Sequence, residues 1–363
     1  MKCYLIAGED SGDLHGRNLV QALQQQDTSW TFRGIGGDQL ARTGMELVAH
    51  VKDTNFMGFA EVVRNLGTIR KLFKTVKADL LSWKPDALIL IDYPGFNLRI
   101  ARFARNLNIP VYYYISPQVW AWKKGRVKKI QRDVDRMYVI LPFEEAFYAK
   151  YGVAVDFVGH PLLDEIPTQV RSAEKKSILA LLPGSRKQEI KRMLPLMLET
   201  ARAFPDYRAV VAGAPSQTQA FYQEIIGQEQ VEVRMNQTYQ LLSNAAYALV
   251  TSGTATLETA LFQVPEIVVY KGNALSFEIG KRLVDVPFIS LVNLIMDKEV
   301  VPELIQYDAR PDKMVAALRG LMEPARAQQL QKDYQALRTK LGESGASART
   351  ASLILSHLKA YSS

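Results

Sequence analysis

Two glycine-containing segments in the second half of the chain have the composition of turns that bind phosphate groups. The first reads Leu-Pro-Gly-Ser-Arg-Lys-Gln-Glu over residues 182–189, and the second reads Thr-Ser-Gly-Thr-Ala-Thr-Leu-Glu over residues 251–258. Each follows a short apolar run, so each predicts a strand-to-helix turn whose free helix amides face an anion. Turns without a ligand also favour Gly and Ser, but two such turns reinforce each other and predict a pyrophosphate site.

Individual side chains in these turns suggest more specific tasks. Arg186 could add a bidentate contact to an anion, and Ser185 and Gln188 have the spacing of a helix capping box. Glu258, one turn into the second helix, could accept hydrogen bonds from ribose hydroxyls, although a solvated helix charge is the competing interpretation. The residues predicted to bind the nucleotide are Gly184, Ser185, Arg186, Ser252, Gly253, Thr254 and Glu258.

In the first half of the chain, carboxylates follow the apolar runs. Residues 7–13 read Ala-Gly-Glu-Asp-Ser-Gly-Asp, and Asp92 comes directly after the apolar run Ala87–Ile91. A partly desolvated carboxylate at the carboxyl end of a strand can take a proton from a sugar hydroxyl, although turn or helix capping explains an aspartate there nearly as well. We predict Asp92 as the general base, with Glu9 and Asp13 as the alternatives. The residues predicted to bind the second substrate are Glu9, Ser11, Gly12, Asp13, Asn97, Ser116 and Gln118.

Aromatic residues beside positive charge mark a surface for an anionic partner. Between Arg64 and Arg132 there are 15 Lys or Arg residues and three Asp, within a chain of net charge +8. This pattern suits a membrane interface or nucleic-acid stacking, and a solvated basic helix face is the alternative. We favour a peripheral membrane surface, with acyl chains or lipid contacting Phe56, Met57, Phe59, Trp120 and Trp122.

Composition narrows the classes of protein that remain. The chain has 363 residues, 48% of them hydrophobic, and its one cysteine, Cys3, cannot form an intramolecular disulfide. The apolar run before Glu9 is too short for a signal peptide, and no run approaches the roughly 20 apolar residues that cross a bilayer. We therefore expect a cytoplasmic protein whose contact with a membrane is peripheral, and the family resemblance described below implies that this membrane is the inner one.

The elements that must position these residues alternate between short β-branched runs and amphipathic helical segments. This alternation predicts an α/β protein with two doubly wound (Rossmann-like) sheets. The charged, Pro-containing stretch 159–176 predicts the division, giving domains 1–165 and 166–345 and a C-terminal helix at 346–363. The predicted strands are Cys3–Ala7, Ala87–Ile91, Val111–Ile115, Arg136–Leu141, Ile178–Leu182, Arg208–Ala212, Ala246–Val250 and Glu266–Tyr270.

Competing nucleotide and metal motifs are incomplete. The glycines of 34–37 lack the dinucleotide-binding spacing, and the chain has no Gly-x-x-x-x-Gly-Lys-Ser/Thr phosphate loop. Asp133-Val134-Asp135 has the form of a metal-binding Asp-x-Asp but no supporting ligands nearby, so we interpret it as a surface turn and predict no metal site.

Taken in order, eight motifs resemble the lipid A disaccharide synthase family, and they extend from the first predicted strand to about residue 305. The motifs are residues 7–13, Met57-Gly58 with Glu61-Val62, Ser-Pro-Gln-Val-Trp-Ala-Trp at 116–122, Leu-Pro-Phe-Glu at 141–144, Gly-His-Pro at 159–161, Leu-Pro-Gly-Ser-Arg at 182–186, Ser-Gly-Thr-Ala-Thr-Leu-Glu at 252–258 and Leu-Val-Asn-Leu at 291–294.

The resemblance implies two facing domains of GT-B type with an interdomain cleft, and an inverting transfer that needs no metal or cofactor. It implies UDP-2,3-diacylglucosamine as donor and 2,3-diacylglucosamine 1-phosphate (lipid X) as acceptor, joined by a β-1,6 linkage. Asp92 matches the family's carboxylate near the acceptor, and Asn97 matches an active-site asparagine. Arg186, Glu258 and Asn293 match its donor-site residues. Gly95 departs from the family pattern, which has a second acidic residue there.

Two other functions remain open at this point. A UDP-N-acetylglucosamine 2-epimerase would use the same fold but would not explain the Trp-rich basic segment. A non-enzymatic nucleic-acid-binding protein would explain the charge but not the two phosphate turns, so we expect no nucleic-acid partner.

Overall fold

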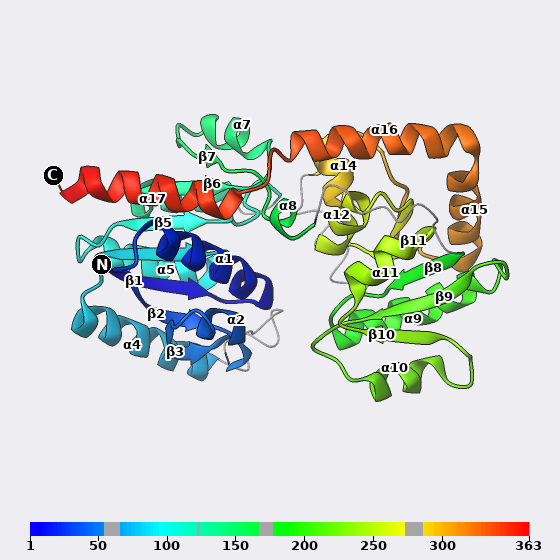
Figure 1. Cartoon of the computed structure of the whole chain (residues 1–363), viewed down its shortest axis with the longest axis horizontal. Helices are drawn as coiled ribbons and strands as arrows, with labels where there is room; N and C mark the ends of the chain where they lie inside the picture. The colour runs from blue at the N-terminus through cyan, green and yellow to red at the C-terminus, as the bar shows by residue number, and fades with distance from the viewer. Residues whose placement is uncertain (54–65, 122–123, 167–176, 273–285, 363) are drawn as a thin grey trace. The chain divides into compact units, whose positions relative to one another are not determined.

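The computed structural model describes residues 1–53, 66–121, 124–166, 177–272 and 286–362 (Figure 1). The chain forms two compact units: unit 1 comprises residues 1–164 and 341–363, and unit 2 comprises residues 165–340. The C-terminal helix, which the sequence set apart as its own segment, belongs to unit 1. None of the helices in the described residues is both long and apolar enough to cross a membrane.

Unit 1 contains a seven-stranded sheet in the order β3-β2-β1-β4-β5-β6-β7, and every neighbouring pair is parallel. The order reverses between β1 and β4, so their carboxyl ends define the switch point where doubly wound sheets bind ligands. The strands are β1 (Lys2–Ala7), β2 (Thr31–Gly36), β3 (Glu46–His50), β4 (Ala87–Ile91), β5 (Val111–Tyr114), β6 (Arg136–Val139) and β7 (Asp156–Phe157).

Helices cover both faces of this sheet, which explains why its central strands are continuously apolar (Figure 1). On one face α1 and α17 pack against Leu5 and Ile89, and on the other face α4 and α5 pack against Ile6 and Leu90. The helices are α1 (Asp10–Gln26), α2 (Asp38–Ala41), α4 (Leu66–Trp83), α5 (Pro94–Arg105), α6 (Val127–Asp133), α7 (Glu144–Ala149), α8 (Leu162–Glu165) and α17 (Ala346–Ser362), with 3-10 turns η1 (Val51–Asp53) and η2 (Lys124–Arg126).

Unit 2 repeats the plan with six parallel strands in the order β10-β9-β8-β11-β12-β13 and a switch point between β8 and β11. Its strands are β8 (Ile178–Leu182), β9 (Arg208–Gly213), β10 (Glu232–Met235), β11 (Tyr247–Thr251), β12 (Glu266–Tyr270) and β13 (Glu303–Ile305). Its helices are α9 (Lys187–Ala201), α10 (Gln219–Ile226), α11 (Thr238–Asn244), α12 (Thr254–Leu261), α14 (Leu291–Met296), α15 (Pro311–Met322) and α16 (Pro324–Lys340).

The interpretation of the Asp-x-Asp segment as a surface turn is wrong for its first residue. Asp133 is fully buried and accepts hydrogen bonds from Arg132 at 2.6 and 2.8 Å and from Arg102 at 3.2 Å. Asp135 pairs with Arg105 and accepts a 2.9 Å hydrogen bond from the Val111 amide. Both carboxylates therefore pair with arginines, and Asp135 also anchors the start of β5.

Candidate active site

The switch point of unit 1 brings the residues 7–13 segment beside Asp92. Ala7 at the end of β1 lies opposite Ile91 at the end of β4, so the two segments leave the sheet side by side. Gly8 has no room for a side chain, because a Cβ there would lie 2.2 Å from Cγ of Tyr93. The predicted general base and its alternative Glu9 therefore share one edge of one sheet.

A strained turn holds Asp92 at this edge. Asp92 and Tyr93 both adopt left-handed backbone conformations, with φ of 43° and 46°, which non-glycine residues rarely adopt. Nδ2 of Asn97 donates to the carbonyl oxygens of Ile91 at 3.2 Å and Asp92 at 2.8 Å, and the Tyr113 hydroxyl also donates to the Asp92 carbonyl. The strain is thus supported by hydrogen bonds that reach the turn from α5 and β5.

The surroundings of Asp92 suit a general base. Burial raises the pKa of its carboxyl to about 7, and the negative charge of Glu9 contributes to the rise. The side chain is only half-buried, so a substrate hydroxyl can approach it. A base with a pKa near the working pH combines a usable ionised fraction with affinity for the transferred proton.

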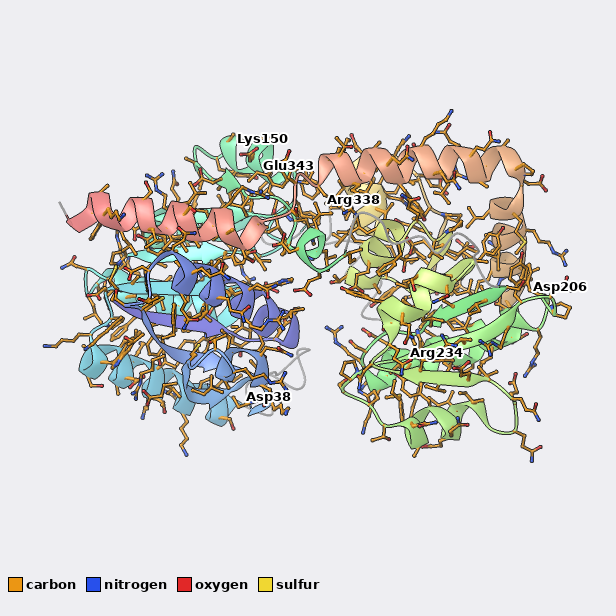
Figure 2. All side chains as sticks on the ribbon, in the orientation of Figure 1. Asp38, Lys150, Asp206, Arg234, Arg338 and Glu343 are labelled. Atoms are coloured by element: carbon orange, nitrogen blue, oxygen red, sulfur yellow. The ribbon has the colours of Figure 1, made fainter. Side chains whose placement is uncertain are left out.

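Two residues predicted to bind substrate, Asp13 and Asn97, form hydrogen bonds to backbone groups of unit 1. The carboxylate of Asp13 accepts from the amides of Gly37 at 2.6 Å, Gln39 at 2.9 Å and Leu40 at 3.1 Å, so it caps α2, whose first residue Asp38 is labelled in Figure 2. Asn97 is fully buried and its amide group serves the Asp92 turn. Asp13 therefore stabilises the start of α2 and Asn97 supports the Asp92 turn, while their contacts with substrate stay predictions.

The other residues around this edge divide by exposure. Ser11 and Gln118 are exposed and can reach a ligand, whereas Gly12 is buried where a Cβ would contact Ala7 and Ile91 at 3.5 and 3.6 Å. Ser116 is buried, and its hydroxyl bonds to the Tyr148 hydroxyl at 2.7 Å and donates to the Pro117 carbonyl at 3.0 Å. Ser116 therefore fixes the start of the loop after β5.

One of the aromatic residues predicted to contact the membrane, Trp120, is buried. Trp120 is 8% exposed and packs edge-on against Phe143, with ring centroids 5.0 Å apart, so in this structure it packs inside unit 1 and its predicted lipid contact stays a prediction. A membrane-facing tryptophan would expose its ring. Phe56, Met57, Phe59 and Trp122 lie outside the described residues.

Glu144, for which the sequence predicted no role, holds the chain that leaves β6 in the same sheet. Its carboxylate is 1% exposed and accepts from the amides of Leu141 at 3.0 Å and Ile140 at 3.3 Å. Burial raises the pKa of Glu144 to about 7. The Leu-Pro-Phe-Glu motif was the available signal, since a glutamate three residues after a strand can cap the chain that leaves it.

In unit 2 the two predicted phosphate turns flank the switch point. Leu182 at the end of β8 lies opposite Val250 of β11. Gly184 has φ of +100°, and a Cβ on it would lie 2.9 Å from Oε2 of Glu189 and 3.6 Å from Cγ2 of Thr251. The turns therefore lie beside each other at the edge where a doubly wound sheet binds a nucleotide.

The first turn starts its helix one residue later than the capping box requires. Arg186 occupies the N-cap position of α9 without a side-chain cap, so the predicted pairing of Ser185 with Gln188 is wrong. The Ser185 carbonyl instead accepts from Ser216 Oγ at 3.1 Å and Gln217 Nε2 at 3.0 Å. Arg186 is 57% exposed and forms an ion pair of 2.9 Å with Glu189, an exposed contact that an anion can readily displace.

The second turn exposes Gly253 and Thr254 at the start of α12. The Ser252 hydroxyl donates to the Ile289 carbonyl at 3.1 Å, which ties the turn to the segment before α14. Glu258 is half-buried and accepts a 2.9 Å hydrogen bond from the Tyr239 hydroxyl. Burial raises the pKa of Glu258, while Tyr239 counteracts the rise.

Asn293 makes its hydrogen bonds inside unit 2. It is fully buried, its Oδ1 accepts from the amides of Val300 and Val301, and its Nδ2 donates to the Val301 carbonyl and to Glu303. An asparagine side chain can make four hydrogen bonds, and all four are made here at 2.8–3.0 Å. These hydrogen bonds hold α14 against the strand β13, and the predicted contact of Asn293 with UDP stays a prediction.

Comparison with known proteins identifies the fold. The glycotransferase of kitacinnamycin superposes with a TM-score of 0.66 at 16% identity, covering 98% of this chain and 99% of that one. A Neisseria meningitidis UDP-GlcNAc 2-epimerase superposes with a TM-score of 0.64 at 14% identity, covering 99% of both chains. The two units thus form a GT-B fold, which by itself does not separate a transferase from an epimerase.

Comparison of sequences distinguishes a transferase from an epimerase. The family model described as lipid-A-disaccharide synthetase matches residues 3–356. The lipid-A-disaccharide synthase of Syntrophus aciditrophicus is 42% identical over 374 residues, covering 98% of this chain and 97% of that protein. With the phosphate turns and Asp92 at the two switch points, these matches show that the chain is a glycosyltransferase and belongs to the lipid-A-disaccharide synthase family.

Proposed function

We propose that the chain transfers 2,3-diacylglucosamine from UDP to the 6-hydroxyl of 2,3-diacylglucosamine 1-phosphate, with inversion at the anomeric carbon. The products are a β-1,6-linked disaccharide 1-phosphate and UDP. The family supports a lipid-linked sugar reaction, and the observation that carries the proposal is the Asp92 carboxyl, held in a strained turn at the switch point with a pKa of about 7.

Unit 2 supplies the groups that suit the UDP part of the donor. The first amides of α9 and α12 lie beside each other at one sheet edge, and a helix N-terminus favours the charge of a pyrophosphate. Arg186 stands at the N-cap of α9 and can stabilise the negative charge that develops as UDP leaves. Glu258 lies one turn into α12 and accepts a hydrogen bond from Tyr239 of α11, and ribose hydroxyls can donate to the same carboxylate.

Unit 1 supplies the group that removes the proton. The acceptor oxygen attacks the anomeric carbon from the face opposite the leaving group, and its proton passes to Asp92. The bond between the anomeric carbon and the phosphate oxygen breaks, and its electron pair leaves with UDP. The attack is easier because Asp92 is partly desolvated and is preorganised by Asn97 and Tyr113.

We expect Glu258→Ala to raise the KM or Kd for the UDP-sugar donor by about tenfold or more, since charge-assisted hydrogen bonds contribute about 1.5–3 kcal/mol. The acceptor KM should change little. Initial rates with each substrate varied in turn measure both constants. Tyr239→Phe, which keeps the carboxylate and removes only its internal partner, serves as the matched control and should lose much less donor affinity. Equal losses for both substrates in Glu258→Ala would contradict a ribose contact.

The reaction's lipid substrates lead us to propose peripheral membrane association through the basic surface of α4. Arg70, Lys71 and Lys74 on this helix are exposed, and each cation near an anionic membrane contributes about 1 kcal/mol. We expect the double variant Lys71→Glu, Lys74→Glu to bind anionic vesicles at least about tenfold more weakly, with wild-type binding falling as salt rises.

Co-sedimentation with vesicles of graded anionic lipid content measures this loss. Lys150→Glu is the control, because Lys150 is exposed at the end of α7 in the same unit, where Figure 2 labels it. Equal binding by all three proteins, or binding that salt leaves unchanged, would count against the α4 surface.

One assay tests the proposed reaction as a whole. UDP release is followed with acylated and unacylated UDP-glucosamine donors, each with and without 2,3-diacylglucosamine 1-phosphate, and the product is identified by mass spectrometry. We expect release only when the acylated donor and the acceptor are both present. Release without acceptor, or conversion of the donor's sugar to an epimer, would refute the proposed transfer.

A further inference from the structure

A strongly basic cavity of about 290 Å³ lies in unit 1 next to the Asp92 turn. Five cationic side chains line it, from α5, η2 and α6: Arg99, Arg102, Arg126, Lys129 and Arg132. The mechanism above uses none of them. A concave site with this lining is suited to an anion rather than to an acyl chain.

The charge in the cavity is only partly compensated. Among the described residues, Asp133 forms ion pairs with two of the five lining cations, Arg102 at 3.2 Å and Arg132 at 2.6 Å. Burial lowers the pKa of Arg126, and the neighbouring Arg99 guanidinium lowers it further. The other four cations are exposed, so five like charges converge on a concavity that is open to solvent, and a dianion can enter it and interact with several of them at once.

The cavity is connected to the proposed general base. Its remaining lining includes Pro94 and Gly95, the first residues of α5, which follow Asp92 by two and three positions. Apart from the adjacent chain and the backbone of α5 itself, no atom of the described residues lies within 4 Å of the position of a Cβ on Gly95, so the helix start is open on that side. The Tyr113 hydroxyl donates to the Asp92 carbonyl, and it also interacts electrostatically with the Arg126 guanidinium of the cavity. An anion in the cavity would therefore lie beside the Asp92 turn.

We propose that this cavity binds the phosphate monoester of the acceptor sugar and so orients the acceptor toward Asp92. The identity of the acceptor rests on the proposed function. The 1-phosphate on C1 and the 6-hydroxymethyl group on C5 flank the ring oxygen of the sugar, so anchoring the phosphate beside the Asp92 turn also brings the 6-hydroxyl close to the base. Arginine guanidinium groups bind phosphate oxygens bidentately, and the volume suits a phosphate with part of a sugar better than a whole lipid.

A specificity ratio tests this assignment. The ratio compares kcat/KM for the 1-phosphorylated acceptor with kcat/KM for the same acceptor without its phosphate. We expect Lys129→Ala and Arg99→Gln each to lower the ratio by about tenfold or more, because a charged hydrogen bond to phosphate is lost. Lys128→Ala is the matched control, since Lys128 is an exposed neighbour on α6 that does not line the cavity. Variants that lose activity equally with both acceptors would overturn the proposal.

A phospholipid headgroup offers the same phosphate chemistry, so two further measurements separate the sources without turnover. Calorimetric titration should show that wild type binds glucosamine 1-phosphate more tightly than glucosamine, and that Lys129→Ala loses this difference. Binding to anionic vesicles should be alike in Lys129→Ala and Lys128→Ala. A Lys129→Ala protein that loses vesicle binding but keeps glucosamine 1-phosphate binding would overturn the proposal in favour of a headgroup site.

These measurements also separate the two proposals. If the transfer assay fails while glucosamine 1-phosphate still binds in a Lys129-dependent way, the proposed function fails and the phosphate site stands. If transfer succeeds and the specificity ratio is unchanged in both variants, the phosphate site fails and the proposed function stands.

Discussion

Asp92→Asn should lower kcat by roughly a hundredfold or more while leaving UDP binding and the fold unchanged. The amide keeps the size and most of the shape of the carboxylate but cannot accept the acceptor's proton, and a general base contributes about 10²–10⁴ in rate. Rapid-quench or steady-state turnover with saturating donor and acceptor gives kcat, and calorimetric titration with UDP gives the binding constant. A loss confined to kcat is the signature of a group that acts in the transition state.

Glu9→Gln is the informative companion to this variant. Glu9 shares the sheet edge with Asp92 and raises the pKa of the Asp92 carboxyl, but the proposed proton transfer goes to Asp92 alone. Its removal should therefore leave kcat within about tenfold of wild type at pH 8, where Asp92 is ionised in either protein. Near-normal turnover by Asp92→Asn together with a collapse in Glu9→Gln would transfer the base to Glu9.

Asn97→Ala should reduce kcat by more than tenfold, leave the acceptor KM nearly unchanged, and destabilise the protein by about 2–4 kcal/mol. The Ile91 carbonyl loses its side-chain donor, and the Asp92 carbonyl keeps only the Tyr113 hydroxyl. A lost hydrogen bond costs about 0.5–1.5 kcal/mol and an unsatisfied buried group about 1–3 kcal/mol. The left-handed Asp92 and Tyr93 backbone then loses one of its supports, so the carboxylate is less well placed.

Urea unfolding and steady-state kinetics on the same preparations measure both effects. Asn106→Ala serves as the control, because Asn106 is an exposed asparagine at the C-terminus of the same helix. If Asn97 instead contacted the acceptor, the variant would show a raised acceptor KM with little change in stability. That result would support the active-site contact that the family resemblance implied for Asn97, and it would contradict a purely structural role.

The central strands were predictable because they are buried on both faces. The predicted bounds of Ala87–Ile91, Ile178–Leu182 and Glu266–Tyr270 agree with β4, β8 and β12. The sequence did not predict β2 or β10, because Thr31–Gly36 contains two glycines and an arginine and Glu232–Met235 alternates charged and apolar residues. Such strands form because a neighbouring strand offers unpaired backbone groups, a condition that no local pattern records.

The site was predictable where chemistry coincides with a strand end. Gly184, Ser252 and Asp92 each follow a buried strand, and the parallel sheet then places them at its carboxyl edge. The roles of Asp13 and Asn293 were not predictable, because their partners lie 24 to 27 and 7 to 10 residues away and exist only in the folded chain. A polar side chain in a motif can form hydrogen bonds to the protein backbone as readily as to a substrate.

The excess of positive charge was also visible in the sequence, but its distribution was not. Lys128 and Lys129 are adjacent and chemically equivalent in the sequence, yet only Lys129 lines the basic cavity. The difference arises because α6 packs against α5 with its buried residues Val127 and Ile130, which fixes the direction of each neighbouring lysine. Charge counting thus predicted an anionic partner, while the helix packing suggests which lysine meets the phosphate.

The dependence of kcat/KM on pH, measured for wild type and Glu9→Gln with the acceptor varied, tests most directly the claim that Asp92 is the base. Burial and the Glu9 charge raise the pKa of Asp92 to about 7, so wild-type activity should fall as pH drops below about 7 and reach a plateau above it. Removing the Glu9 charge should shift this acid limb to lower pH. An acid limb that stays in place in Glu9→Gln, or a wild-type profile that is flat between pH 5 and 8, would contradict the account.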